Sequence, residues 1–189
     1  MGDAKPHPHV RNVRFEELVL VDLPSDARHE LYRDGGSNER VMTAQGGVTY
    51  RYHSMTDLTG YSTSTFDLVY IGQAIEHVSI SQADDVLAQV HRILRPSGYL
   101  ALDTPNSKVT RLQHDRYIDP DHKYEYSHAE MASKLSARQF RIIEGKGLNY
   151  AGNSVRSGAF DVGEVANSIG MFADLENCYL LCYVCQPDQ

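Results

Sequence analysis

The sequence predicts an α/β fold, a three-layer sandwich in which helices cover both faces of a mostly parallel sheet. Apolar strand-like runs alternate along the chain with segments of helical periodicity, an order typical of βαβ units. The strand runs are nearly all apolar, as expected when both faces of a strand are buried. The length of 189 residues and the apolar fraction of 41% suit a single domain over residues 1–189.

The first half of the chain is expected to hold two strands. The run "ELVLVDL" is apolar and β-branched and stops before Pro24, as a strand does at a loop. The run "GVTYRYHSM" alternates and is rich in Thr and Tyr, which favour strands. Pro24 and Ser25 are helix-start residues, and Gly35 follows as a stop. We therefore expect strands at 17–23 and 47–55, a short helix at 24–34, an irregular segment at 1–16 and a loop at 58–65.

The second half is expected to continue with longer elements. Apolar residues recur at helical spacing between 86 and 94. Ser81 is the expected N-cap of this helix, with Asp84 near its positive end, and Pro96 stops it. Further strands are expected at 66–72, 98–106, 140–149 and 178–186, a helix at 127–140, a polar loop at 107–127, and an irregular stretch at 150–170 with a helical turn near 162–166.

Polar or glycine residues stand just past four of the expected strands. They are Asp22–Leu23, Asp57–Leu58, Gly72–Gln73 and Thr104–Asn106. The carboxyl ends of parallel strands share one edge of a sheet, where open α/β folds bind ligands. We expect these residues to line one ligand site, although a strand-end Asp is also an ordinary turn residue.

The stretch from 57 to 106 resembles the second half of the class I S-adenosylmethionine-dependent methyltransferase domain. Its "FDLVYIGQAIEHV" is similar to the family's fourth strand with its Glu-His-Val segment, and "QVHRILRPSGYLALDTPN" to the following helix end and strand. Pro96-Ser97-Gly98 stands where the family has Pro-Gly-Gly. More loosely, "LVLVDL" resembles the second strand and "CYLLCYVCQP" the last, antiparallel strand. The resemblance implies a Rossmann-like fold and S-adenosylmethionine as cofactor.

The resemblance also implies which residues hold the cofactor. It assigns the ribose hydroxyls to Asp22 and Leu23, the adenine to Asp57 and Leu58, the methionine end to Gly72 and Gln73, and a remnant of the glycine-rich loop to Gly2. A carboxylate suits a ribose diol because it accepts two charge-assisted hydrogen bonds. A glycine lets the backbone approach the cofactor closely.

The acceptor side carries weaker signals. His77 and His122 are candidate catalytic residues, although Glu76-His77 is also ordinary chemistry for the start of a helical segment. The family often places the segment 107–127 over the acceptor, so we expect it to be a substrate-side loop. Candidate substrate contacts there are Asn106, Tyr124 and Tyr126.

The family's first strand and its Gly-x-Gly loop have no counterpart here, since the chain opens with "MGDAKPHPHV". The start is expected to be truncated, and three explanations stay open: a late start of the reading frame, a truncated gene, or a fold that dropped the strand. Without that strand, 18–22 and 66–71 either pair directly or leave a gap with unpaired backbone groups. A partner subunit would fill such a gap, so a homodimer is one expectation.

Two clusters of potential metal ligands are expected to bind none. The segment "HDRYIDPDHKYEYSH" at 114–128 is rich in His and Asp, but it shows no ligand spacing typical of a metal site. Cys182 and Cys185 would point to opposite faces of a strand. We expect no metal, and read the three cysteines as small buried hydrophobes.

Composition excludes several other classes. The net charge is −7 and no cluster of Lys and Arg stands out, which disfavours nucleic acid as a partner. No apolar run approaches the length of a membrane span, and no apolar leader segment follows Met1. A cytoplasmic location is therefore expected.

The function expected from the resemblance is methyl transfer from S-adenosylmethionine to a small-molecule, lipid or sugar acceptor. Two alternatives stay open. One is an inactive relic of the same fold that serves as a binding or oligomerisation module, because the glycine-rich loop is missing. The other is a metal-dependent hydrolase that uses the 114–128 segment.

Overall fold

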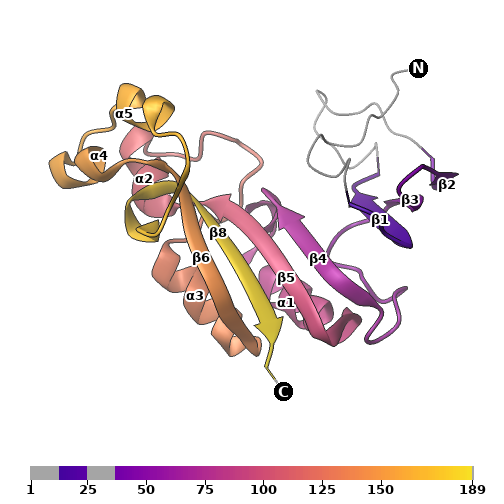
Figure 1. The fold of residues 1–189 in the computed structure, drawn as a ribbon. Helices are drawn as coiled ribbons and strands as arrows, with labels where there is room; N and C mark the ends of the chain where they lie inside the picture. The colour runs from indigo at the N-terminus through magenta and orange to yellow at the C-terminus, as the bar shows by residue number, and fades with distance from the viewer. Residues whose placement is uncertain (1–12, 25–36, 189) are drawn as a thin grey trace. The chain divides into compact units, whose positions relative to one another are not determined.

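A computed structural model describes residues 13–24 and 37–188. The chain divides into two compact units, Met1–Asp57 and Leu58–Gln189 (Figure 1). The expected helix at 24–34, apart from Pro24, and most of the expected irregular segment at 1–16 lie outside the described residues, as does Gly2.

The first unit holds a three-stranded sheet with the order β1-β3-β2. Strands β1 (Glu17–Asp22) and β3 (Gly47–Tyr52) pair in parallel, and the short β2 (Glu39–Met42) runs antiparallel to β3. The two strands predicted from the sequence are therefore confirmed. The sequence pattern did not indicate β2, because its four residues are all exposed and carry no apolar alternation.

The second unit holds a five-stranded sheet with the order β4-β5-β8-β6-β7. Strands β4 and β5 are parallel, and β8 runs antiparallel to both β5 and β6, so β4, β5 and β6 share one direction. The predicted antiparallel last strand is confirmed. The bounds are β4 Phe66–Gly72, β5 Leu94–Pro105, β6 Phe140–Tyr150, β7 Met171–Phe172 and β8 Cys178–Pro187.

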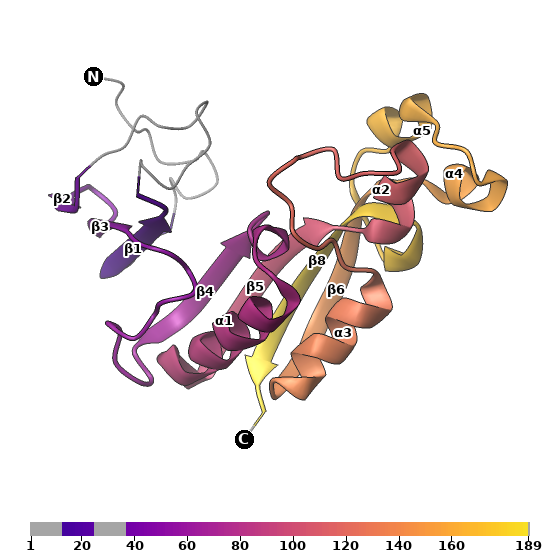
Figure 2. The same cartoon turned by 180° about the vertical axis from the view of Figure 1, so that it is seen from behind.

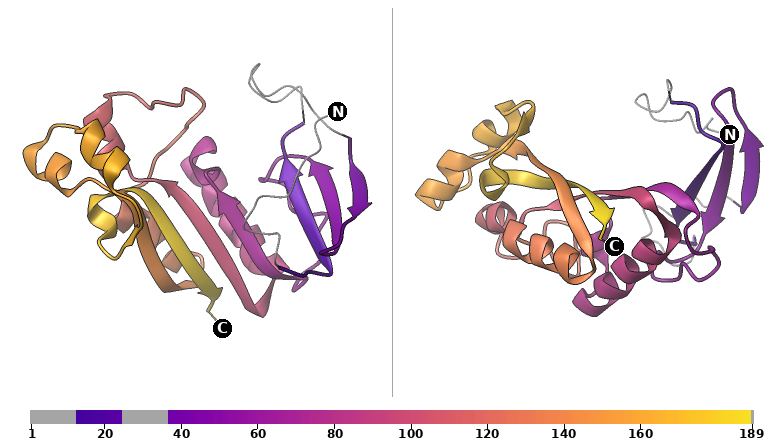
Figure 3. Two further views of the ribbon diagram at one scale, coloured as in Figure 1. Left: turned by 45° about the horizontal axis from the view of Figure 1, so that its top comes forward. Right: turned by 60° about the horizontal axis from the view of Figure 1, so that its bottom comes forward.

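Two helices cover one face of this sheet, as Figure 2 shows. They are α1 (Ile80–Ile93) and α3 (His128–Ala137). The remaining helices gather at the end of the sheet where β5 and β6 finish (Figure 3). These are α2 (Ser107–Gln113), α4 (Gly152–Ser157) and α5 (Val162–Asn167), and two 3-10 turns, η4 (Ile75–His77) and η5 (Leu175–Asn177), complete the unit.

The core lies between α1, α3 and the sheet. Leu87 of α1 is fully buried, as are Leu100 of β5 and Leu135 of α3. The opposite face of the sheet exposes Leu68 and Tyr70 of β4. The described residues of this unit therefore supply the sheet and one helical layer. The α/β class predicted from the sequence is confirmed.

Three local expectations need correction. The N-cap of α1 is Ser79 rather than Ser81, because Ser79 forms a reciprocal capping box with Gln82. The segment 107–127 contains α2, which Asn106 caps. The stretch 150–170 contains α4 as well as the expected helical turn, which is α5. For 18–22 and 66–71 the sequence left direct pairing and a gap both open; β1 and β4 belong to different sheets.

Candidate functional site

In the first unit, two exposed carboxylates follow the carboxyl ends of adjacent parallel strands. Asp22 ends β1 and lies in register with Tyr52, the last residue of β3. The backbone N–H of His53 donates to the carbonyl of Asp22 at 2.9 Å, and a turn closed by Asp57 N–H to Ser54 O at 3.0 Å follows. β3 ends at Tyr52, before the expected strand end at 55, so Asp57 lies in the turn that follows the strand rather than directly at its end.

These carboxylates fit the polar groups of an adenosine. The Leu23 N–H donates to Asp22 Oδ1 at 2.7 Å and orients the carboxylate. A carboxylate has about four lone-pair sites and can accept several hydrogen bonds, which is the chemistry that a ribose diol requires. Leu58, at the start of the second unit, is buried, and its N–H donates to Gln89 Oε1 at 2.8 Å. The Leu58 N–H is therefore already engaged, so the adenine contact expected of this backbone group would require a rearrangement.

The end of β4 is shaped by Asp103 of the neighbouring strand β5. Asp103 accepts from Tyr70 Oη at 2.6 Å and from Gln73 Nε2 at 2.7 Å. Gln73 has a φ of 46°, a backbone conformation that non-glycine residues adopt rarely and that gathers at functional sites. A Cβ at Gly72 would lie 2.6 Å from Tyr70 Oη, so the tyrosine ring lies against the glycine backbone. The hydrogen bond to Asp103 raises the pKa of Tyr70 to about 12, with a further contribution from burial.

Beyond β4, Glu76 and His77 form the turn η4, and the 107–127 segment returns to them. The Glu76 carbonyl accepts from Lys123 N–H at 2.7 Å and from Tyr124 N–H at 3.1 Å. This backbone clamp brings His122 beside His77, with ring centroids 4.7 Å apart in an edge-to-face arrangement. The two candidate catalytic histidines, distant in sequence, therefore lie in contact.

Glu76 is a fully buried carboxylate in the same cluster. Its Oε2 accepts from Thr104 Oγ1 at 2.9 Å, whereas its Oε1 is buried without a hydrogen-bond partner among the described residues. Burial raises the pKa of Glu76, and hydrogen bonds from its own backbone N–H and from Thr104 oppose that rise only in part. A buried, unpaired carboxylate oxygen costs free energy, so this feature requires an explanation.

His122 is held by a second buried acid, Glu125. His122 Nδ1 lies 2.7 Å from Glu125 Oε1, and Thr110 Oγ1 donates to the other oxygen. Burial alone would lower the pKa of His122, but the hydrogen bond to Glu125 and the nearby carboxylates outweigh it and raise the pKa. Burial raises the pKa of Glu125, and its hydrogen bonds to His122 and Thr110 reverse that to a net lowering. For His77, burial lowers the pKa.

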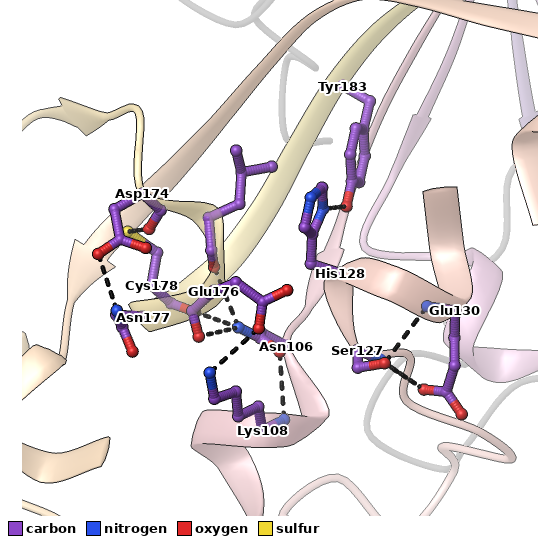
Figure 4. A network of polar contacts seen from close by, with 11 residues as sticks. Asn106, Lys108, Ser127, His128, Glu130, Asp174, Glu176, Asn177, Cys178 and Tyr183 are labelled. Atoms are coloured by element: carbon purple, nitrogen blue, oxygen red, sulfur yellow. Dashed lines mark hydrogen bonds and ion pairs between the residues drawn. The ribbon is translucent and has the colours of Figure 1, made fainter. Parts of the chain in front are cut away.

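The three expected substrate contacts have mainly structural surroundings. Asn106 is fully buried; its Nδ2 donates to three backbone carbonyls around η5, and its Oδ1 accepts from Lys108 N–H at 3.1 Å. Figure 4 shows this network and the capping box of Ser127 and Glu130 beside it. Tyr124 donates to Glu130 at 2.6 Å. The Tyr126 hydroxyl is buried without a partner among the described residues.

The sequence pattern missed two residues that shape the site, Asp103 and Glu125, and gave no sign of the contact between Thr104 and Glu76. Asp103 orders the β4 end, Thr104 and Glu76 form a buried pair, and Glu125 holds His122. Thr104 was noted only as part of a strand end, and Glu76 only as a partner of His77. Their roles depend on register between β4 and β5 and on the path of the 107–127 segment, and neither is visible as a local pattern.

Comparison with known proteins identifies the family and the fold. A family model described as "Methyltransferase domain" matches residues 2–102, which is more than half of the chain. A search of curated proteins finds no significant match. Among the described residues, no helix is long and apolar enough to cross a membrane.

Three solved structures illustrate the likeness. A SAM-dependent methyltransferase from Archaeoglobus fulgidus is 14% identical, with a TM-score of 0.54 over 72% of this chain and 66% of its own. A Burkholderia thailandensis 1,6-didemethyltoxoflavin-N1-methyltransferase with bound S-adenosylhomocysteine is 16% identical, with a TM-score of 0.50 over 75% and 52%. The small RNA methyltransferase HEN1 is 14% identical, with a TM-score of 0.53 over 75% and 16%.

At these identities the structural likeness concerns the fold. The chain also spans less than two thirds of the length of each of the three structures. The family model nevertheless covers β1, β3, β4 and the carboxylates that follow them. S-adenosylmethionine is the cofactor that this family and these structures imply. The chain belongs to the methyltransferase domain family.

Proposed function

We propose that the protein transfers a methyl group from S-adenosylmethionine to a small-molecule, lipid or sugar acceptor. The observation that carries this proposal is the pair of exposed carboxylates that follow the parallel strands β1 and β3: Asp22 is the last residue of β1, and Asp57 lies in the turn after β3. Both lie within the segment that the family model matches. Their position and chemistry suit the ribose and adenine of the cofactor.

The remaining cofactor contacts follow from the resemblance. Leu23 accompanies Asp22 at the ribose, and Gly72 with Gln73 meets the methionine end. Leu58 accompanies Asp57 at the adenine once its N–H leaves Gln89. Bound S-adenosylmethionine supplies an activated methyl group on a sulfonium sulfur. The protein's part is to hold the acceptor atom in line with that methyl group, a contribution of proximity and orientation.

The acceptor side is proposed to be the cluster around His77 and His122, at the carboxyl end of β4. Tyr124 and Tyr126 lie next along the same segment and are proposed acceptor contacts. Asn106 is a weaker candidate because its amide is fully engaged by the backbone. The net charge of −7 keeps nucleic acid outside the proposal, although one structural neighbour is an RNA methyltransferase. A homodimer and a cytoplasmic location remain part of the proposal.

Calorimetric titration of the full chain with S-adenosylhomocysteine tests the cofactor part. Asp22→Asn and Asp57→Asn are each expected to weaken binding by about ten- to a hundredfold, since hydrogen bonds to a charged group contribute roughly 1.5–3 kcal/mol. Asp85→Asn, on the exposed side of α1, is the matched control and is expected to leave affinity unchanged. If the folded chain binds no S-adenosylhomocysteine at millimolar concentration, the proposed methyltransferase activity is refuted and the inactive relic is favoured.

A further inference from the structure

We propose that Glu76, His77 and His122 bind a divalent transition-metal ion at the carboxyl end of β4. Each of the three residues offers one ligand atom, and these atoms all lie within 4.8 Å of one another. All three belong to the second unit. The site gives the two candidate catalytic histidines the role of metal ligands.

The buried carboxylate of Glu76 gives the first reason. Glu76 is 0% exposed, and its Oε1 has no hydrogen-bond partner among the described residues. Protonation would not remove the problem, because the resulting O–H would also have no acceptor at Oε1. A metal cation at this oxygen satisfies it, since buried charges in proteins are paired or coordinate metals.

The support behind His122 gives the second reason. With its Nδ1 bonded to Glu125 at 2.7 Å, His122 presents Nε2 as a ligand atom. Metal-binding histidines almost always donate their other ring N–H to a carboxylate or carbonyl, which fixes the tautomer and the ring orientation. Glu125 is in turn fixed by a hydrogen bond from Thr110. This chain from a threonine through a carboxylate to an imidazole is the outer-shell arrangement typical of metal sites.

The ligand set selects the class of metal. Two imidazoles and one carboxylate suit zinc and its first-row neighbours rather than an all-oxygen cation such as calcium. Tetrahedral zinc at ordinary bond lengths separates ligand atoms by about 3.3 Å. Ligand atoms up to 4.8 Å apart would therefore have to move closer by up to about 1.5 Å through side-chain rotations, which half-buried histidines permit. Three protein ligands leave at least one coordination position open.

The open position deepens the proposed function, on which this part of the inference rests. Because the cluster lies on the proposed acceptor side, the metal would hold an oxygen of the acceptor and orient it for methylation. A metal-bound hydroxyl also loses its proton more readily. The acceptor class this favours is a hydroxyl-bearing small molecule or sugar.

Cobalt is the probe that reports the site directly, through its visible absorption when bound by nitrogen and oxygen ligands. All variants are made in the full chain with His7→Ala and His9→Ala, so that these two histidines supply no competing cobalt ligands. We expect one Co²⁺ per chain, displaced by Zn²⁺. Glu76→Gln and His122→Asn are each expected to weaken binding at least about tenfold, and Glu125→Gln by about ten- to a hundredfold. His114→Asn, an exposed histidine of the same segment, is the matched control and is expected to bind normally.

A folded chain that binds no Co²⁺ at millimolar concentration, or binds it equally well with Glu76→Gln and His122→Asn, overturns the proposal. Should Glu76→Gln fail to fold, as judged by its melting curve, His77→Asn at the half-buried ligand replaces it. The S-adenosylhomocysteine titration is run on the same samples. Binding of S-adenosylhomocysteine without binding of cobalt refutes the metal site alone. Binding of cobalt without binding of S-adenosylhomocysteine refutes the proposed methyl transfer alone.

Discussion

Replacing Asn106 by Ala tests whether this buried residue supports the fold or contacts the acceptor. The side chain is 0% exposed and donates to the carbonyls of Leu175 at 3.2 Å, Glu176 at 3.4 Å and Cys178 at 2.8 Å. It also caps α2 by accepting from Lys108 N–H. The network joins the end of β5 to η5 and the start of β8 (Figure 4).

The size of the effect follows from those contacts. Loss of an N-cap costs about 1 kcal/mol. Buried carbonyls left without their donor cost about 1–3 kcal/mol in addition. We therefore expect Asn106→Ala to lower the free energy of unfolding by roughly 2–4 kcal/mol. For a chain of this size, that corresponds to a fall in Tm of about 5–15 °C.

Urea and thermal unfolding followed by circular dichroism measure this loss. Asn106→Asp keeps the cap oxygen but removes the three donations, so it is expected to be at least as destabilising as the alanine variant. Asn153→Ala, an exposed helix residue, is the surface control and is expected to change stability by less than about 0.5 kcal/mol. An unchanged Tm for Asn106→Ala, together with lost acceptor affinity, would refute the structural role and support a substrate contact.

Three further predictions concern stability. The hydrogen bond and charge of Lys134 lower the pKa of Asp84. Because the pKa of Asp84 is lower in the folded than in the unfolded chain, the ionised carboxylate stabilises the fold above the ordinary pKa of aspartate. This stabilisation is lost as the pH falls through the folded pKa. Asp84→Asn should remove about 1 kcal/mol of stability at neutral pH and little at strongly acidic pH, measured as urea midpoints across pH. An unchanged acid slope would contradict this. Leu87→Ala, at a fully buried position of α1, should cost about 2–5 kcal/mol in urea unfolding. Ser79→Ala should cost about 1 kcal/mol through its capping box, whereas Ser81→Ala should be near neutral if Ser79 is the true cap.

The strands β1, β3, β4 and β8 could be predicted because their signals are local. Each is a run of apolar or β-branched residues bounded by polar or glycine residues, and such runs form strands in the folded sheet. The helix α1 was equally clear from its apolar stripe. The first residue of α1 could not be predicted, because Ser79 and Ser81 are each followed three residues later by a polar residue that suits a cap. Only the hydrogen bonds to Gln82 distinguish the two.

The helix α2 could not be predicted from its own residues. It is short and mostly polar, and helices of this length are marginal in isolation. It is held in place by tertiary contacts: Asn106 caps its start, and its own residues Val109 and Thr110 are buried against the rest of the fold. Stability that comes from the rest of the fold leaves no periodic pattern in the segment itself.

The metal cluster shows why site chemistry is harder to predict than strands. Glu76 and His77 are adjacent in sequence, but their partner His122 reaches them through a loop with no periodic pattern. The loop is fixed by hydrogen bonds from the backbone N–H groups of Lys123 and Tyr124 to the Glu76 carbonyl, and any residue type other than proline can supply such bonds. The residue types along the loop therefore do not indicate its path. Only the side chains that this backbone contact brings together indicate the chemistry of the site. There, an unpaired buried oxygen, an imidazole oriented by an acid and a second imidazole edge-on to it converge. That convergence distinguishes this cluster from His114, Asp115 and Asp121 of the 114–128 segment, which remain exposed on the loop. It makes Glu76 the position at which a single oxygen-to-nitrogen change should separate the ligand role from a purely structural one.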